Sequence, residues 1–261
     1  MKLNIVPART GISWVKLGVQ TFLKQPLALT GLFFMYMAAV LVISQIPMVG
    51  TFLGAMLVPA ATLGLMAASS EAASGRFPMP TVLVSAFRAG RQRARAMLTL
   101  GAIYTAGSLL ATLLGSLLVG GAAPASADPQ NPQFDGRMLV VLLLHFPLVV
   151  LFWHAPALVH WHGISPVKSL FFSAVACLRN FGALLMYGIT WLAVFLVVGF
   201  IFSTIGMMLG GVAVARSIMM PTVLLLVAMF STSLYFTFRD SFHADDDAQL
   251  VPTVPGGEST P

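Results

Sequence analysis

Histidine is the residue type in this chain best suited to binding a metal or carrying a proton, because its neutral imidazole does both near physiological pH. Most of the histidines, His145, His154, His160 and His162, fall in or beside one apolar stretch. On a helix, His145 and His154 point to opposite faces, whereas His154 and His162 share a face about 12 Å apart along the axis. That spacing is too long for one metal ion, and zinc would need further His, Cys or carboxylate ligands close by. We expect packed or interfacial histidines with no metal and no cofactor, and we keep metal or haem handling by this stretch as a second alternative.

The densest charge on the chain is a run of arginines directly before an apolar stretch: Arg88, Arg91, Arg93 and Arg95. Basic clusters beside a membrane span attract anionic head groups by roughly 1 kcal/mol per residue. The same cluster also serves as an ordinary topology signal. Lys24 and Arg179 stand at matching places before two other apolar stretches. We expect these basic residues to bind anionic lipid, with cardiolipin as a candidate.

The sequence offers few candidate catalytic residues. All of the acidic residues lie in polar segments: Glu71, Asp128, Asp135, Asp240, Asp245, Asp246, Asp247 and Glu258. No carboxylate is therefore placed to carry a proton or hold Na⁺ in the middle of a membrane. The sequence also lacks Gly-x-Ser-x-Gly, His-Glu-x-x-His and a phosphate-binding glycine loop. We expect a protein that is not an enzyme.

The composition indicates which elements must position these residues. Of the 261 residues, 58% are apolar and 8% are charged, with a mean hydropathy of +0.91. A soluble domain carries about 25% charged residues, so this chain belongs in a membrane. A helix crosses the hydrocarbon core with about 20 mainly apolar residues. The segments that qualify are Leu27–Ile46, Val49–Ala68, Ala96–Gly120, Met138–Val159, Phe181–Ile205 and Ile218–Phe238. We predict an all-α polytopic membrane bundle of six transmembrane helices.

The basic residues predict how the bundle is oriented. With the N-terminus inside, the inner side holds Lys2, Arg9, Lys16, Lys24, Arg76, Arg88, Arg91, Arg93, Arg95, Lys168, Arg179 and Arg239. The outer side holds only Arg137 and Arg216. This asymmetry predicts that both termini face the cytoplasm. The predicted loops of the outer side are a tight turn near Pro47, a polar stretch from Gly121 to Gly136, and a Gly210-Gly211 connection. After a transmembrane domain over residues 1–239, residues 240–261 are expected to be a disordered, acidic cytoplasmic tail.

An internal repeat organises the spans. Polar-apolar segments with helical periodicity precede the first, third and fifth spans, the second over Thr81–Arg95 and the third over Pro166–Asn180. In the first, Arg9, Ser13, Lys16, Gln20 and Lys24 form a basic face. In the third, Val167, Leu170, Phe171, Ala174, Val175 and Leu178 are expected to be buried. The motif Gly11-Ile12-Ser13-x-Val15-Lys16 returns as Gly163-Ile164-Ser165-x-Val167-Lys168. We predict three parallel repeats, at about 8–70, 77–160 and 163–239, each an interfacial amphipathic helix followed by two spans.

Two functions remain open at this stage. The leading hypothesis is a membrane scaffold, assembly or anionic-lipid-binding protein, whose partners are membrane lipids and either another protein or a second copy of the chain, but not nucleic acid. The alternative is a permease or channel for a small or lipid-like substrate, formed where Pro59, Pro156 and Pro221 kink their spans. A polar cavity lined by His145, His154, Ser231 and Ser233 would favour the alternative, and a dry interior would favour the scaffold.

The two ends of the apolar region carry patterns that resemble a known family. The first is Val6-x-Ala8-x-x-Gly11-x-x-Trp14-x-x-x-Gly18, and the second is Tyr235-x-x-x-Arg239-Asp240-x-Phe242. They resemble a family of uncharacterised six-span inner-membrane proteins of beta-proteobacteria, named only by a locus tag. The family favours Tyr where this chain has Phe238. The resemblance covers residues 1–242, implies a bacterial inner-membrane location and brings no known activity.

Overall fold

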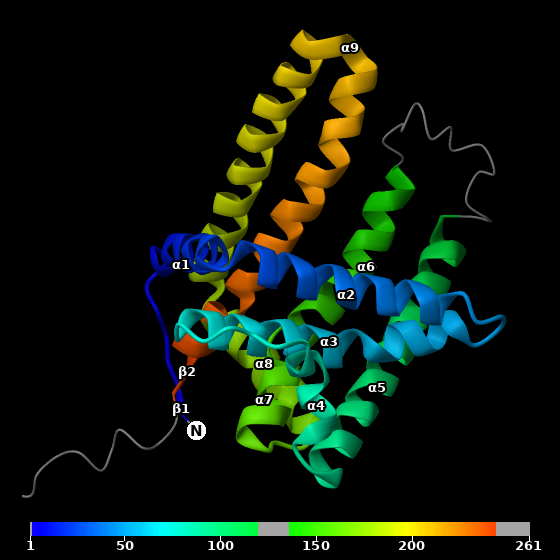
Figure 1. Cartoon of the computed structure of the whole chain (residues 1–261). Coiled ribbons are helices and arrows are strands. Elements are labelled where there is room, and N and C mark those ends of the chain that lie inside the picture. Colours follow the sequence, from blue (N-terminus) through cyan, green and yellow to red (C-terminus); the bar gives the residue numbers. More distant parts are fainter. Residues whose placement is uncertain (1, 120–135, 244–261) are drawn as a thin grey trace, which may run out of the picture.

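The computed structural model describes residues 2–119 and 136–243, and these residues are almost wholly helical. The helices are α1 (Thr10–Lys24), α2 (Pro26–Ser44), α3 (Gly50–Ala73), the 3₁₀ helix η1 (Pro80–Val84), α4 (Ser85–Arg88), α5 (Arg91–Leu118), α6 (Gly136–Phe152), α7 (Ala155–His162), α8 (Pro166–Arg179) and α9 (Phe181–Ser241). Two short strands, β1 (Lys2–Leu3) and β2 (Phe242–His243), pair antiparallel at the two ends (Figure 1). The expected outer loop at 121–136 lies almost entirely outside the described residues. The disordered tail predicted over 240–261 begins too early, because residues 240–243 end α9 and form β2, which pairs with β1; the rest of the predicted tail lies outside the described residues.

Five helical stretches are long and apolar enough to cross a membrane: α2, α3, α5, the α6–α7 stretch Leu139–His162, and α9. Their outward side chains are large and apolar, such as Leu27, Leu143 and Phe200, which are 88%, 70% and 74% exposed. Contiguous apolar surface of this kind suits lipid and not water. The chain is an all-α, multi-pass membrane protein, as the composition predicts.

The helix α9 doubles back on itself. Its 61 residues would extend about 90 Å if straight, three times the thickness of the hydrocarbon core. Gly210 and Gly211 have non-helical backbone angles, and Gly211 has a φ of 73°, which favours glycine. Figure 1 shows the two arms, yellow and orange, lying side by side beyond this turn. The Gly210-Gly211 connection predicted from the sequence is therefore present.

The helix α1 packs on α9 and forms one of the buried clusters of the core. Trp14 and Val15 contact Tyr187, Trp191 and Phe236. The basic face predicted from the sequence is confirmed, because Arg9, Ser13, Lys16, Gln20 and Lys24 are all exposed. Much of the opposite face is covered by protein, whereas Ile12 and Leu23 are 46% and 64% exposed. The apolar face of α1 is therefore covered by the rest of the protein only in part, and the remainder is exposed on the surface of the molecule.

The single amphipathic helix predicted over Thr81–Arg95 is wrong. The segment is broken into η1 and α4, and the chain then turns at Gly90, whose φ of 102° favours glycine. Arg91, Arg93 and Arg95 form the first turns of α5, so this helix begins five residues before the predicted span at Ala96. The polar residues of this segment do recur at helical spacing, but that spacing does not show that the helix is interrupted at Gly90.

The helix α8 confirms the third amphipathic segment but buries a different face. Its protein-facing residues are small, Ser169, Ser173, Ala176 and Cys177. Three of the apolar residues predicted to be buried are exposed: Val167 (71%), Phe171 (63%) and Leu178 (70%). The small residues are required because α8 lies against the break between α6 and α7. There Ser173 Oγ accepts from the His154 N–H at 3.0 Å and donates to the Val150 carbonyl at 3.0 Å.

Candidate functional site

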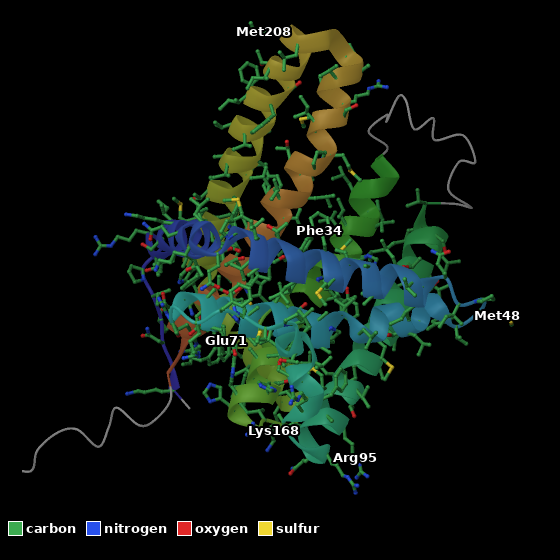
Figure 2. The ribbon with its side chains drawn as sticks, viewed as in Figure 1. Phe34, Met48, Glu71, Arg95, Lys168 and Met208 are labelled. Carbon is green, nitrogen blue, oxygen red and sulfur yellow. The ribbon has the colours of Figure 1, made fainter. Side chains whose placement is uncertain are left out.

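The arginines predicted to bind lipid mark the start of α5. Arg88 ends α4, and all four arginine side chains are exposed. Figure 2 shows Arg95 and Lys168 at the end of the molecule opposite Met208. No carboxylate in the described residues forms an ion pair with these arginines. The ion pair that the described residues do form joins Arg239 and Asp240, at the end of α9. Basic side chains at a helix N-terminus add to the positive end of the helix dipole, so this end of α5 carries uncompensated positive charge.

A polar cleft of about 450 Å³ lies beside this cluster. Its walls come from α3, the segment after it, η1, α4 and α7, through Glu71, Met79, Thr81, Val82, Ser85, Arg88, Ala89 and His160. Two polar atoms there, Ser85 Oγ and His160 Nδ1, are buried without a hydrogen-bond partner in the described part of the chain. Unpartnered buried polar atoms are rare and costly, so they mark a place where a ligand can bind.

The structure brings only Arg88 of the predicted lipid-binding residues into this cleft. Arg91, Arg93 and Arg95 continue the positive surface along α5, and Arg93 acts electrostatically on His160. Lys24 and Arg179 are exposed at the ends of α1 and α8, and neither lines the cleft. Sequence reasoning missed Glu71 and Ser85 as members of the site. Residues 71–89 supply most of the wall, whereas His160 is far away in sequence, and no local pattern joins it to the rest.

The histidines proposed for a pore are separated by the fold. His145 lines a small, largely apolar cavity of about 180 Å³ together with Thr62, Tyr104, Leu148, Val149, Phe152, Trp153, Phe230 and Leu234. His154 is only 1% exposed and lies against Phe238 and Phe242, with ring centroids 6.0 and 5.5 Å away. Across the described residues, no group of three His, Cys, Asp or Glu side chains is placed to hold a metal ion.

The remaining elements of the predicted pore do not converge on that cavity either. Ser231 donates to the Val227 carbonyl, and Ser233 is hydrogen-bonded to Tyr187 and Trp191. Pro59 is buried within α3, Pro156 begins α7, and Pro221 is exposed within α9. None of these residues lines the cavity beside His145. Of the residues predicted for a permease, only His145 therefore lines this cavity.

The two terminal sequence patterns meet in space. Trp14 Nε1 donates to Asp240 Oδ2 at 2.9 Å, and Arg239 Nε donates to Asp240 Oδ1 at 2.8 Å. Asn180, between α8 and α9, accepts from the Val6 N–H at 2.9 Å and donates to the Asn4 carbonyl at 3.0 Å. This terminal junction holds the N-terminal segment to the end of α9. The amide after Arg179 was visible in the sequence, but its role as an anchor was not.

Comparison with known proteins gives one informative relative. A protein of Burkholderia thailandensis named "probable inner membrane protein" is 37% identical over 271 residues, covering 98% of each chain. No family model matches the chain, and no solved structure matches it. The similarity extends over nearly the whole length of both proteins.

Proposed function

The chain belongs to the family of this Burkholderia inner membrane protein, and from that premise we propose a non-enzymatic, six-span protein that binds anionic lipid. In this proposal Arg88, Arg91, Arg93 and Arg95 hold lipid head groups at the cytoplasmic face of the inner membrane. The bound lipids then serve a scaffold or assembly role. The family resemblance found at the two ends of the sequence is confirmed by the relative; the lipid-binding role is our inference.

One observation carries the proposal. Four exposed arginines gather at the N-terminus of a membrane-capable helix, and no described carboxylate pairs with them. Helix N-termini ordinarily favour negative charge, because the backbone N–H groups there lack partners. An anionic phosphate head group would bind both the guanidinium groups and the helix end.

Two features support six spans with both termini on one side. The turn at Gly210 and Gly211 divides α9 into two arms, which adds one pass to the five membrane-capable stretches. The pairing of β1 with β2 holds the two ends of the described chain together. Ends on the same side require an even number of passes. The excess of basic residues on that side then favours the cytoplasm.

The scaffold is preferred to a permease because of what lies between the helices. The cavity beside His145 is small and mostly apolar, and the kinking prolines stand away from it. Substrate pathways in membranes are commonly lined by polar or ionisable groups. A larger and polar cleft is found instead beside the arginines.

The proposal is tested by native mass spectrometry of protein extracted with its own lipids. We expect Arg88→Gln, Arg91→Gln, Arg93→Gln and Arg95→Gln together to reduce retained anionic lipid by at least about tenfold. At roughly 1 kcal/mol for each basic residue, four substitutions exceed the 1.4 kcal/mol that corresponds to a tenfold change.

The control is a variant with the same loss of charge at scattered positions: Lys2→Gln, Arg9→Gln, Lys16→Gln and Lys168→Gln. These side chains are exposed on β1, just before α1, on α1 and on α8. The control should retain most of its anionic lipid. Equal lipid retention by the cluster variant and the wild type would refute the proposal.

A further inference from the structure

We propose that the cleft beside Arg88 binds the head group of a phospholipid that carries both a phosphate and a primary ammonium group, that is, phosphoethanolamine. The inference rests on the proposed lipid-binding function and gives the cleft a ligand distinct from the anionic lipids of the arginine cluster. Its volume of about 450 Å³ lies in the ordinary range of small-ligand sites.

The lining residues suited to a phosphate are Arg88, Ser85 and His160, which come from α4 and α7. Arg88 supplies a permanent charge and paired N–H donors, the geometry that suits phosphate oxygens. Ser85 Oγ is buried without a partner among the described residues, and rotation about χ1 offers its hydroxyl a phosphate oxygen as acceptor. His160 Nδ1 is likewise unpartnered in the same wall.

Glu71 supplies the selectivity. It is half-buried at the end of α3 and forms no ion pair or side-chain hydrogen bond with any described residue, although it shares the cleft with Arg88. A ligand carrying phosphate alone would place a negative charge beside this carboxylate, which is unfavourable. A ligand with phosphate at one end and ammonium at the other satisfies both charges of the cleft. The ammonium group donates hydrogen bonds to a carboxylate, whereas the quaternary amine of choline has no N–H to donate.

Exposed apolar residues indicate that the ligand comes from a membrane. Met79 lines the cleft and is 61% exposed. On the same segment, Phe77, Val84 and Phe87 are 64%, 48% and 37% exposed. Apolar side chains beside a polar cleft suit the boundary between head groups and acyl chains. A free metabolite such as inorganic phosphate has no apolar part to contact this surface.

The test measures lipid preference on the full-length protein. Delipidated protein in detergent is given equal amounts of phosphatidylethanolamine, phosphatidylcholine and phosphatidylglycerol with the same acyl chains, and the retained lipids are counted by native mass spectrometry. We expect the wild type to retain phosphatidylethanolamine about tenfold better than phosphatidylcholine, the ratio that one charge-assisted hydrogen bond provides. Glu71→Gln should lose this preference, and Glu71→Asp should keep part of it.

The matched control is Arg91→Gln, which removes a charge from the cluster but touches no wall of the cleft. It should lower retention of phosphatidylglycerol and leave the ratio of ethanolamine to choline lipid unchanged. Glycerophosphoethanolamine should displace the ethanolamine lipid, and inorganic phosphate should not.

Two outcomes overturn the inference: an unchanged lipid ratio in a folded Glu71→Gln protein, or displacement by inorganic phosphate as effective as that by glycerophosphoethanolamine. Both concern selectivity for ethanolamine. Failure of the proposed function would instead appear as unchanged phosphatidylglycerol in the four-arginine variant, so the two failures are distinguishable.

Discussion

At the scale of single residues, one hydrogen bond of the terminal junction comes from a fully buried side chain. Trp14 is 0% exposed, and its indole N–H donates to Asp240. We expect Asp240→Ala to lower the free energy of unfolding by about 1–3 kcal/mol, because the buried N–H loses its acceptor. Unfolding by a titration with sodium dodecyl sulfate, followed by tryptophan fluorescence, measures the change.

Arg239→Gln is the control for this prediction. It removes the ion pair with Asp240 and the contact with the Phe236 ring, but it leaves the acceptor of Trp14 in place. Exposed ion pairs and cation–π contacts contribute about 1 kcal/mol or less, so the loss should be smaller than in Asp240→Ala. The prediction is wrong if the two variants are destabilised equally.

The residues of the junction could be found in the sequence, but their meeting could not. Trp14, Gly18 and Asp240 all belong to the two terminal patterns, and a motif indicates that residue types matter. The hydrogen bond between Trp14 and Asp240 joins positions 226 residues apart. Periodicity and spacing carry information over a few helical turns only, so the contact required the structure. The same limit hid Glu71 and His160 as neighbours of Arg88.

At the scale of elements, the contact between α1 and α9 depends on glycine at one crossing point. A Cβ atom at Gly18 would lie 2.3 Å from Ser233 Cβ and 2.8 Å from Ser233 Cα. We expect Gly18→Ala to lower the free energy of unfolding by about 1–3 kcal/mol, since the two backbones must separate. The same detergent titration measures this change.

Gly31→Ala in α2 is the matched control, because a Cβ atom there meets nothing within 4 Å. It should leave stability unchanged or raise it by up to about 1 kcal/mol through higher helix propensity. Equal stability of Gly18→Ala and Gly31→Ala would contradict the packing of α1 on α9.

Elements were predicted well where composition decides them and less well where a single residue does. The long apolar runs identified the membrane-capable helices, and the glycine pair identified the turn in α9. The break at Gly90 and the buried small face of α8 were missed. For α8 the outcome depends on its neighbours. It packs against the backbone near the break between α6 and α7, so Ser173 and Cys177 face inward to bond the Val150 carbonyl, and Phe171 faces outward.

At the scale of the whole molecule, the number of passes and their orientation can be tested with the natural cysteine as a silent background. Cys177 is buried, and burial raises the pKa of its thiol to about 12. Maleimides react with the thiolate, so at neutral pH we expect no labelling of the folded wild-type protein. Labelling after denaturation shows that the cysteine itself is intact.

Single cysteines on this background report the side of the membrane. Met48→Cys lies in the turn between α2 and α3, and Met208→Cys lies two residues before the turn in α9; these methionine side chains are 92% and 83% exposed. Ser13→Cys and Ser74→Cys lie on α1 and just after α3, and both are exposed. In intact spheroplasts a membrane-impermeant maleimide should label the first pair, and it should label the second pair only after lysis. Because six passes require both turns to face outward together, labelling of Met48→Cys and Met208→Cys from opposite sides would exclude the six-span arrangement. If only Ser13→Cys and Ser74→Cys were labelled in spheroplasts, the orientation of the protein would be the reverse of the proposed one, and the arginine cluster would lie outside.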